Sequence, residues 1–224
     1  MYIKFSCFAL MLMACLQGFG QDRSITIQVV GGPSLGWWKL NQLHVPLQVT
    51  TPLLNGTGGL LVQYPIGSAL SLKTGTLLES KGSRYRLTVE DPLQEDIRYV
   101  SESRSRNPHL NIPLLLEWFP GAQNRLFVQA GPYVSYRLTQ SADMRITVNG
   151  TTKSLPAYIQ DAQRWGAGIS LGAGLKIPLT EAIHLQSSLM FNQGLMHTAP
   201  VQSARGIGSS DLSVNLLTGL GIRL

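Results

Sequence analysis

The chain has 224 residues, of which 44% are hydrophobic and 13% charged, and its 18 basic residues outnumber 12 acidic ones for a net charge of +6. This length fits one domain, and the low charge excludes a strongly charged or disordered chain. The mean hydropathy is near zero, and no segment after the N-terminus reaches the roughly eighteen apolar residues of a membrane-spanning helix. A β-barrel, which alternates apolar and polar residues, has this near-neutral hydropathy.

Residues 1–20 have the organisation of a secretory signal peptide. Lys4 supplies the positive charge, residues 5–16 form the apolar part, and Gly18-Phe19-Gly20 offers a cleavage site before Gln21. An uncleaved membrane anchor and lipid attachment at Cys15 are the alternatives. We therefore expect a signal peptide over 1–20 and an outer-membrane β-barrel domain over 21–224.

Eight segments after residue 20 have the composition of strands, and most of them alternate apolar and polar residues. They are 24–38, 58–66, 70–85, 109–119, 125–140, 165–179, 182–196 and 211–224. In 165–179 every odd-numbered residue is apolar, whereas the even-numbered ones are mainly glycine, with Ser170 and Lys176. Because successive side chains of a strand point to opposite faces, this pattern favours an apolar outside and a narrow inside.

The connections between these segments alternate in length. Short ones span 65–69, 120–124 and 178–181, and long polar ones span 39–57, 86–108, 141–164 and 197–210. This pattern predicts an all-β fold: an eight-stranded antiparallel up-and-down transmembrane β-barrel with short periplasmic turns and long extracellular loops. Asn55-Gly56-Thr57 and Asn149-Gly150-Thr151 are predicted to be turns, the second at the tip of a hairpin that joins 144–148 to 152–155.

Aromatic residues lie near both ends of the predicted strands, where rings bridge acyl chains and headgroups in membrane barrels. The expected girdles consist of Trp37, Tyr85, Tyr136 and Trp165 beside the long loops, and of Tyr64 and Trp118 beside the short turns. Aromatic residues that cap a soluble core are the alternative interpretation.

If the apolar rows face lipid, the opposite rows place charged residues inside the barrel. This expected polar network of the lumen consists of Lys73, Glu79, Glu117, Arg137, Lys176, His184 and Arg223. Buried charges must pair, so we expect Glu79 and Glu117 to form salt bridges with some of Arg137, Lys176 and Arg223. A structural plug is favoured over an ion path, because side chains fill a barrel of this size.

Several segments resemble the PorT-like family of outer-membrane β-barrel proteins of Bacteroidetes. The resemblance lies in residues 72–82, in 110–117 (Leu-Asn-Ile-Pro-Leu-Leu-Leu-Glu), in 130–136 and in the closing 219–224. It implies the barrel fold, a place in the cell outer membrane and a possible partner in the envelope or the secretion machinery. Members of this family share no common activity, so the resemblance implies no reaction.

These observations favour a non-enzymatic outer-membrane barrel with a structural, adhesion or secretion-associated role. We expect no cofactor, no bound metal and no nucleic acid; the expected partners are outer-membrane lipid and lipopolysaccharide. The arginines of the long loops either bind lipopolysaccharide phosphates or, as the favoured alternative, are ordinary solvated loop charges. One alternative is a lipid-acting barrel enzyme, with a Ser/His/acid site built from His109 or His197 and from Glu102 or Asp211. Another is a soluble lipocalin-like calyx, which needs apolar residues inside.

Overall fold

The computed structural model describes residues 24–40, 48–90, 98–121, 125–139, 141–148, 151–156, 164–195 and 209–224. The predicted signal peptide, Cys15 and His197 lie outside these residues. The signal peptide therefore stays a prediction, and lipid attachment at Cys15 stays the alternative to it. All regular structure in the described parts is β-strand. None of their residues belongs to a helix long and apolar enough to cross a membrane.

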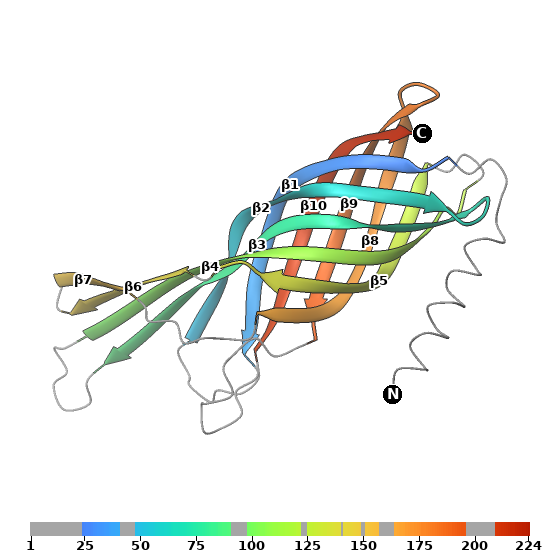
Figure 1. The fold of residues 1–224 in the computed structure, drawn as a ribbon. Coiled ribbons are helices and arrows are strands. Elements are labelled where there is room, and N and C mark those ends of the chain that lie inside the picture. Colours follow the sequence, from blue (N-terminus) through green and yellow to red (C-terminus); the bar gives the residue numbers. More distant parts are fainter. Residues whose placement is uncertain are drawn as a thin grey trace, which may run out of the picture.

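Eight of the ten strands form a closed antiparallel barrel, in the ring order β1, β2, β3, β4, β5, β8, β9 and β10, and β10 returns to β1 (Figure 1). The strands are β1 (Thr26–Leu40), β2 (Gln48–Pro65), β3 (Leu70–Glu90), β4 (Arg98–Trp118), β5 (Leu126–Arg137), β6 (Ser141–Val148), β7 (Thr151–Pro156), β8 (Trp165–Pro178), β9 (Ile183–Gly194) and β10 (Ser209–Arg223). The predicted all-β barrel is therefore confirmed.

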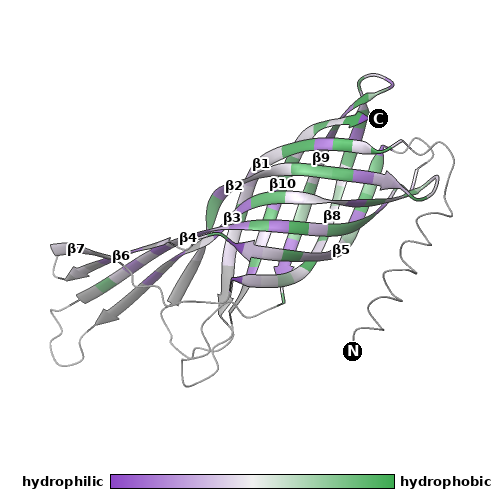
Figure 2. Ribbon diagram, in the orientation of Figure 1, coloured by the Kyte–Doolittle hydropathy of each residue, from purple (hydrophilic) through white to green (hydrophobic). Residues whose placement is uncertain are grey.

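The apolar rows face outward, as the alternation predicts. Ile169 and Leu171 of β8 are 42% and 53% exposed, and Leu216 of β10 is 45% exposed. Apolar residues alternate with polar or small ones along the barrel strands (Figure 2). The lipocalin-like alternative is therefore wrong, because a calyx has its apolar rows inside.

The glycines of β8 make room for large side chains of its neighbour β5. Gly168 pairs with Tyr133 and Gly174 with Phe127, and a Cβ atom at either glycine would meet the ring of its partner. These two rings are buried in the lumen. The glycine-rich row is thus the complement of the bulky inward row on β5, as in designed sheets where an aromatic ring covers a glycine.

The barrel has a short-turn end and a long-loop end. The connections β2–β3, β4–β5 and β8–β9 lie at the short-turn end, and the first and last described residues meet there. The amide of Leu224 donates to the carbonyl of Ile25 at 2.8 Å. The N- and C-terminal strands therefore start and finish at the same end, as an up-and-down barrel with an even number of strands requires.

Much of what the polar composition predicts as long loops is a sheet that continues the barrel wall. Strand β2 begins at Gln48, β3 runs to Glu90, β4 starts at Arg98, and β6 pairs with the outer part of β4. Together these parts form a protruding sheet beyond the ring (Figure 1). The predicted loops 39–57 and 86–108 are wrong to this extent, because backbone pairing between neighbours, not apolar alternation, holds these strands. Within 141–164 the sequence predicts a hairpin, but not its pairing with β4.

The two Asn-Gly predictions have different outcomes. The hairpin prediction is confirmed, since β6 and β7 pair from Val148–Thr151 to Asp143–Pro156. The turn predicted at Asn55-Gly56-Thr57 is wrong, because this segment lies inside β2, where the register with β3 shifts between Pro52 and Thr57. Such an irregularity tolerates glycine for the same conformational reason as a turn does.

Candidate functional site in the barrel lumen

The lumen contains two polar networks separated by an apolar layer. The short-turn network is centred on an ion pair between Lys73 of β3 and Glu117 of β4, whose side chains are 1% and 0% exposed. The Lys73 ammonium also donates to Gln129 at 3.4 Å and lies 5.0 Å from the centre of the Phe127 ring. These contacts replace the water that a buried cation loses.

A row of glutamines completes the short-turn network. The amide nitrogen of Gln28 on β1 donates to the side-chain oxygens of Gln63 at 3.0 Å and Gln186 at 2.9 Å. All three side chains are buried. They connect β2, β1 and β9 across the lumen, so the network joins strands on both sides of the point where the barrel closes.

The apolar layer lies between the two networks and was not predicted from the sequence. It consists of inward-facing Val30, Leu61, Leu77, Leu115, Met190 and Leu217. The cavity that these side chains leave beside Lys73 and Gln129 has a volume of about 10 Å³. A single water molecule needs about that much space, so the described lumen is filled at this level.

The long-loop network is centred on a second buried ion pair, between Lys81 of β3 and Asp211 of β10 at 2.6 Å. The hydroxyl of Tyr133 lies 3.3 Å from the Lys81 ammonium. Glu79 accepts hydrogen bonds from Asn111 at 2.5 Å and from Ser34 at 3.3 Å. These contacts join β3 to β1, β4, β5 and β10 and so connect distant parts of the wall.

The residues predicted for the lumen divide into three places. Lys73 and Glu117 lie in the short-turn network and Glu79 in the long-loop network. Arg137 is buried near the long-loop end of β5. Lys176, His184 and Arg223 line a cavity at the short-turn end.

The predicted pairing is wrong for both glutamates. Glu117 pairs with Lys73, and Glu79 is held by Asn111 and Ser34. In the part of the chain that the structure describes, neither carboxylate lies within ion-pair distance of an arginine. Adjacent strands β3 and β4 place Lys73 and Glu117 close together, whereas the expected arginines lie near the ends of their strands.

Lys81 and Asp211 were missed as a pair. Lys81 extends the odd-numbered inward row of Lys73 and Glu79, and Asp211 begins the inward row of Ser213 and Asn215. The sequence alternation therefore already places both side chains on the lumen side of their strands. Their proximity is not visible in the sequence, because it depends on the strand order around the ring.

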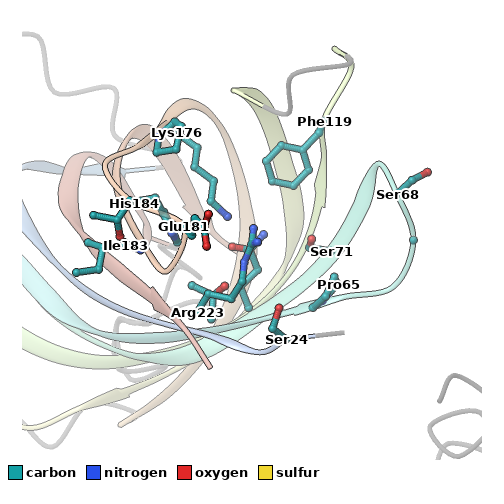
Figure 3. Close-up of a pocket in the computed structure, with 15 residues that line it drawn as sticks. Ser24, Pro65, Ser68, Ser71, Phe119, Lys176, Glu181, Ile183, His184 and Arg223 are labelled. Atoms are coloured by element: carbon teal, nitrogen blue, oxygen red, sulfur yellow. Dashed lines mark hydrogen bonds between the residues drawn. The ribbon is translucent and has the colours of Figure 1, made fainter. Parts of the chain in front are cut away.

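The cavity at the short-turn end, here called the vestibule, has a volume of about 700 Å³. Its residues come from the turns β2–β3 and β8–β9, from the first and last described segments of the chain and from the adjacent strand ends (Figure 3). Lys176 of β8 and Arg223 of β10 extend into it. The Lys176 ammonium lies 5.9 Å from the centre of the Phe119 ring.

Five of the six residues predicted for the aromatic girdles have side chains that the structure describes. Tyr136 and Trp165 pack edge to face with ring centres 4.9 Å apart, and together with Ile112 they line an outward groove. Trp118 lies on the outer surface at the opposite end. Trp37 and Tyr64 are half-buried, and the side chain of Tyr85 lies outside the described part of the chain.

The protruding sheet carries an outer arginine face, defined by outward-row residues of β3, β4 and β6. Arg84 pairs in register with Arg104, and Arg104 with Asp143. Arg86 pairs with Glu102, with 3.5 Å between the guanidinium and the carboxylate, and their side chains are 58% and 41% exposed. These rows continue the face that is apolar on the barrel.

Of the residues considered for a catalytic site, His109 and Asp211 both lie in the lumen near Lys81 and interact electrostatically, whereas Glu102 does not join them. His109 is buried in the lumen and its Nδ1 lies 2.7 Å from the carbonyl of Asn107; Asp211 is paired with Lys81. Glu102 lies outside, on the outer arginine face. Within the described residues no three His, Cys, Asp or Glu side chains form a group that could hold a metal ion. The expectations of no cofactor and no enzymatic activity stay predictions.

Comparison with known proteins finds a family and similar folds. A model of the family "Outer membrane protein beta-barrel domain" matches residues 47–199, more than half of the chain. A search of curated proteins found no match. Solved structures similar to the chain include Neisserial surface protein A, with 11% identity, 91% of this chain and 100% of that chain covered and a TM-score of 0.42. OprG from Pseudomonas aeruginosa is 16% identical, with 92% of this chain and 98% of that chain covered and a TM-score of 0.42. The protease OmpT from Escherichia coli is 8% identical, with 91% of this chain and 97% of that chain covered and a TM-score of 0.39. At these values the likeness carries no argument about function.

Proposed function

The chain belongs to the outer membrane protein beta-barrel domain family, and we propose that it is a non-enzymatic structural component of the outer membrane and not a pore. Its barrel anchors the protruding sheet on one side of the membrane and the vestibule on the other. The long-loop end faces the cell exterior and the short-turn end faces the periplasm, which is the usual orientation of such barrels.

The observation that carries this proposal is the filled lumen. Two buried ion pairs, Lys73–Glu117 and Lys81–Asp211, lie on either side of the apolar layer. An ion passing along the axis would have to lose its water at the apolar layer, which is costly. Eight-stranded barrels are generally filled by side chains in this way.

The outer arginine face supports a contact with lipopolysaccharide. Arg84, Arg86 and Arg104 follow the outward apolar rows of β3 and β4 toward the exterior, where lipid phosphates lie next to the hydrocarbon. Guanidinium groups bind phosphate oxygens through paired hydrogen bonds. Glu102 and Asp143 on the same face reduce its net positive charge without cancelling it.

The finer assignment to the PorT-like family is part of the proposal. It is supported by the resemblance of residues 110–117, which form the inner part of β4 and supply Glu117 to the short-turn network. Under this assignment the barrel serves adhesion, envelope assembly or protein secretion together with a protein partner in the envelope. The protruding sheet and the periplasmic turns are the two surfaces that such a partner would reach.

Deletion of the gene, followed by profiling of the outer membrane, the secreted proteins and lipid A, tests this role. We expect changed amounts of envelope or secreted proteins with an unchanged lipid A profile, and full complementation by the wild-type gene. Loss of a specific lipid A modification, restored by wild type but not by His109→Ala, would contradict the non-enzymatic proposal and favour the lipid-acting alternative.

The lipopolysaccharide contact is tested by titrating lipopolysaccharide into the detergent-solubilised protein. The variant R84Q/R86Q/R104Q should bind about fivefold more weakly for each arginine removed, since each basic residue near anionic lipid contributes about 1 kcal/mol. K153Q is the matched control, because Lys153 on β7 pairs with Ile146 and lies on the other face of the sheet. Equal affinity of the triple variant and wild type would refute the contact.

A further inference from the structure

The vestibule combines cationic side chains with a scarcity of counter-charges. Lys176, Arg223 and His184 line it, and Glu181 at the β8–β9 turn is the carboxylate among its lining residues. Ion pairs in the described parts of the chain are Lys73–Glu117, Lys81–Asp211 and Arg86–Glu102. Lys176 and Arg223 therefore have no carboxylate within 4 Å among the residues that the structure describes.

His184 adds a buried group with unused hydrogen-bonding capacity. Its side chain is buried, and its Nε2 atom has no hydrogen-bond partner among the described residues. The ring packs against Gly221 of β10, where a Cβ atom would collide with it. Buried polar atoms without a partner are rare in proteins and call for water, an ion or a ligand.

The remaining lining residues supply neutral donors and an apolar wall. Ser24, Thr26, Ser71 and Thr180 contribute hydroxyl groups, and Phe119 closes one side next to Lys176. The volume of about 700 Å³ exceeds that of an inorganic ion and lies in the range of small-molecule sites. Lys176 and Arg223 project into the opening from β8 and β10, the two neighbours of β9 (Figure 3).

We propose that the vestibule is a binding site for a small anion bearing phosphate or carboxylate oxygens, which enters from the short-turn end. Arg223 and Lys176 donate hydrogen bonds to the anionic oxygens, and His184 and the hydroxyl groups contact the remainder of the ligand. The buried Lys73–Glu117 pair and the apolar layer close the site on the inner side, so the anion enters and leaves through the same opening. The inference goes beyond the structural role proposed above, because a filled lumen needs no ligand at its mouth.

The test uses the mature chain in lipid nanodiscs and isothermal titration with two probes, inorganic phosphate and acetate. We expect saturable binding of at least one probe, weakened at least about tenfold in K176Q and in R223Q, since a charge-assisted hydrogen bond contributes about 1.5–3 kcal/mol. K153Q is the matched control, because Lys153 on β7 pairs with Ile146 and lies neither in the vestibule nor on the outer arginine face, and it should bind like wild type. Preference for phosphate or for acetate identifies which oxygens the site selects.

Two outcomes would overturn the proposal: no saturable binding of either probe, which would mean that water alone satisfies these groups, or equal affinity of wild type, K176Q and R223Q. The gel mobility of unheated samples verifies that each variant is folded. If K176Q fails to fold, R223Q still decides the question, since Arg223 is exposed beside the chain end. The titration measures anion binding, whereas conductance and gene deletion with complementation test the structural role. A negative result in one therefore leaves the other proposal standing.

Discussion

Strands β3 and β4 pass through two different environments, and their two halves have opposite surface chemistry. In the barrel the even-numbered residues, such as Leu78 and Leu116, are apolar and exposed, while Lys73 and Glu117 are buried. In the protruding sheet the even-numbered row carries Arg84, Arg86 and Arg104. The pairing between the strands continues without interruption across this change.

The comparison shows that backbone pairing and surface chemistry are separate properties of one strand. The pairing between β3 and β4 keeps one register from Leu70–Trp118 to Glu90–Arg98, with a gap at Gly75 and Thr76 inside the barrel. Along the barrel the outward row meets hydrocarbon, where a charge is costly, and beyond the barrel it meets water and headgroups, where an arginine is favourable. The same type of interaction should therefore differ in strength between the two regions.

The largest expected difference concerns ion pairs. Glu117→Ala leaves Lys73 as an uncompensated buried charge and should lower the free energy of unfolding by about 3–5 kcal/mol. Glu102→Ala breaks the exposed pair with Arg86 in the protruding sheet and should cost less than about 1 kcal/mol. Urea unfolding in lipid vesicles measures both. Equal losses for the two variants would contradict the difference in environment.

The double variant Lys73→Met/Glu117→Met sharpens this result. Apolar residues of similar volume replace both charges, so most of the stability lost in Glu117→Ala should return. If the double variant is as unstable as the single one, the cost comes from lost packing and not from the unpaired ammonium.

The next largest effect concerns the outward row. Leu116→Arg places a charge in hydrocarbon at the level of the apolar layer and should cost about 2–4 kcal/mol. The reverse exchange beyond the barrel, Arg84→Leu, should change the free energy of unfolding by less than about 0.5 kcal/mol. The same vesicle assay applies, and tolerance of Leu116→Arg would show that this row does not face lipid.

The smallest effect concerns glycine. Gly221→Ala would press a methyl group into the His184 ring and should cost about 1–3 kcal/mol. The double variant Gly221→Ala/His184→Ala should recover part of this cost. Gly56→Ala, in the outer part of β2 where a Cβ atom would have no neighbour within 4 Å, should change stability by less than about 0.5 kcal/mol. A cost for Gly221→Ala that persists in the double variant would exclude crowding by His184.

The barrel could be predicted because its alternation is local. The odd-numbered row from Trp165 to Leu179 is apolar without interruption, and Asn149-Gly150 identifies a hairpin by itself. The apolar layer was not predicted, although alternation places Leu77 in the inward row of Lys73 and Leu115 in the inward row of Glu117. That these inward residues meet side chains from other strands at one level of the lumen depends on strand order and register, which the sequence alone does not show.

The protruding sheet and the Lys81–Asp211 ion pair could not be predicted from the sequence, for two different reasons. Residues 98–106 are rich in serine and arginine, a composition typical of loops, although β3 and β6 pair with them on both sides. Lys81 and Asp211 are 130 positions apart in the chain. Their contact requires β3 and β10 to lie in one closed ring, which no local pattern reveals. The vestibule likewise depends on closure of the barrel, since the first and last described segments of the chain line it together with two turns.

The central claim is that side chains close the lumen, and planar-bilayer conductance of the purified protein tests it most directly. Wild type should show no stable conductance steps, whereas L77A/L115A, which shortens two members of the apolar layer, should raise the current. Steady ion conductance by folded wild-type protein, unchanged in L77A/L115A, would contradict the closed lumen and the structural role built on it.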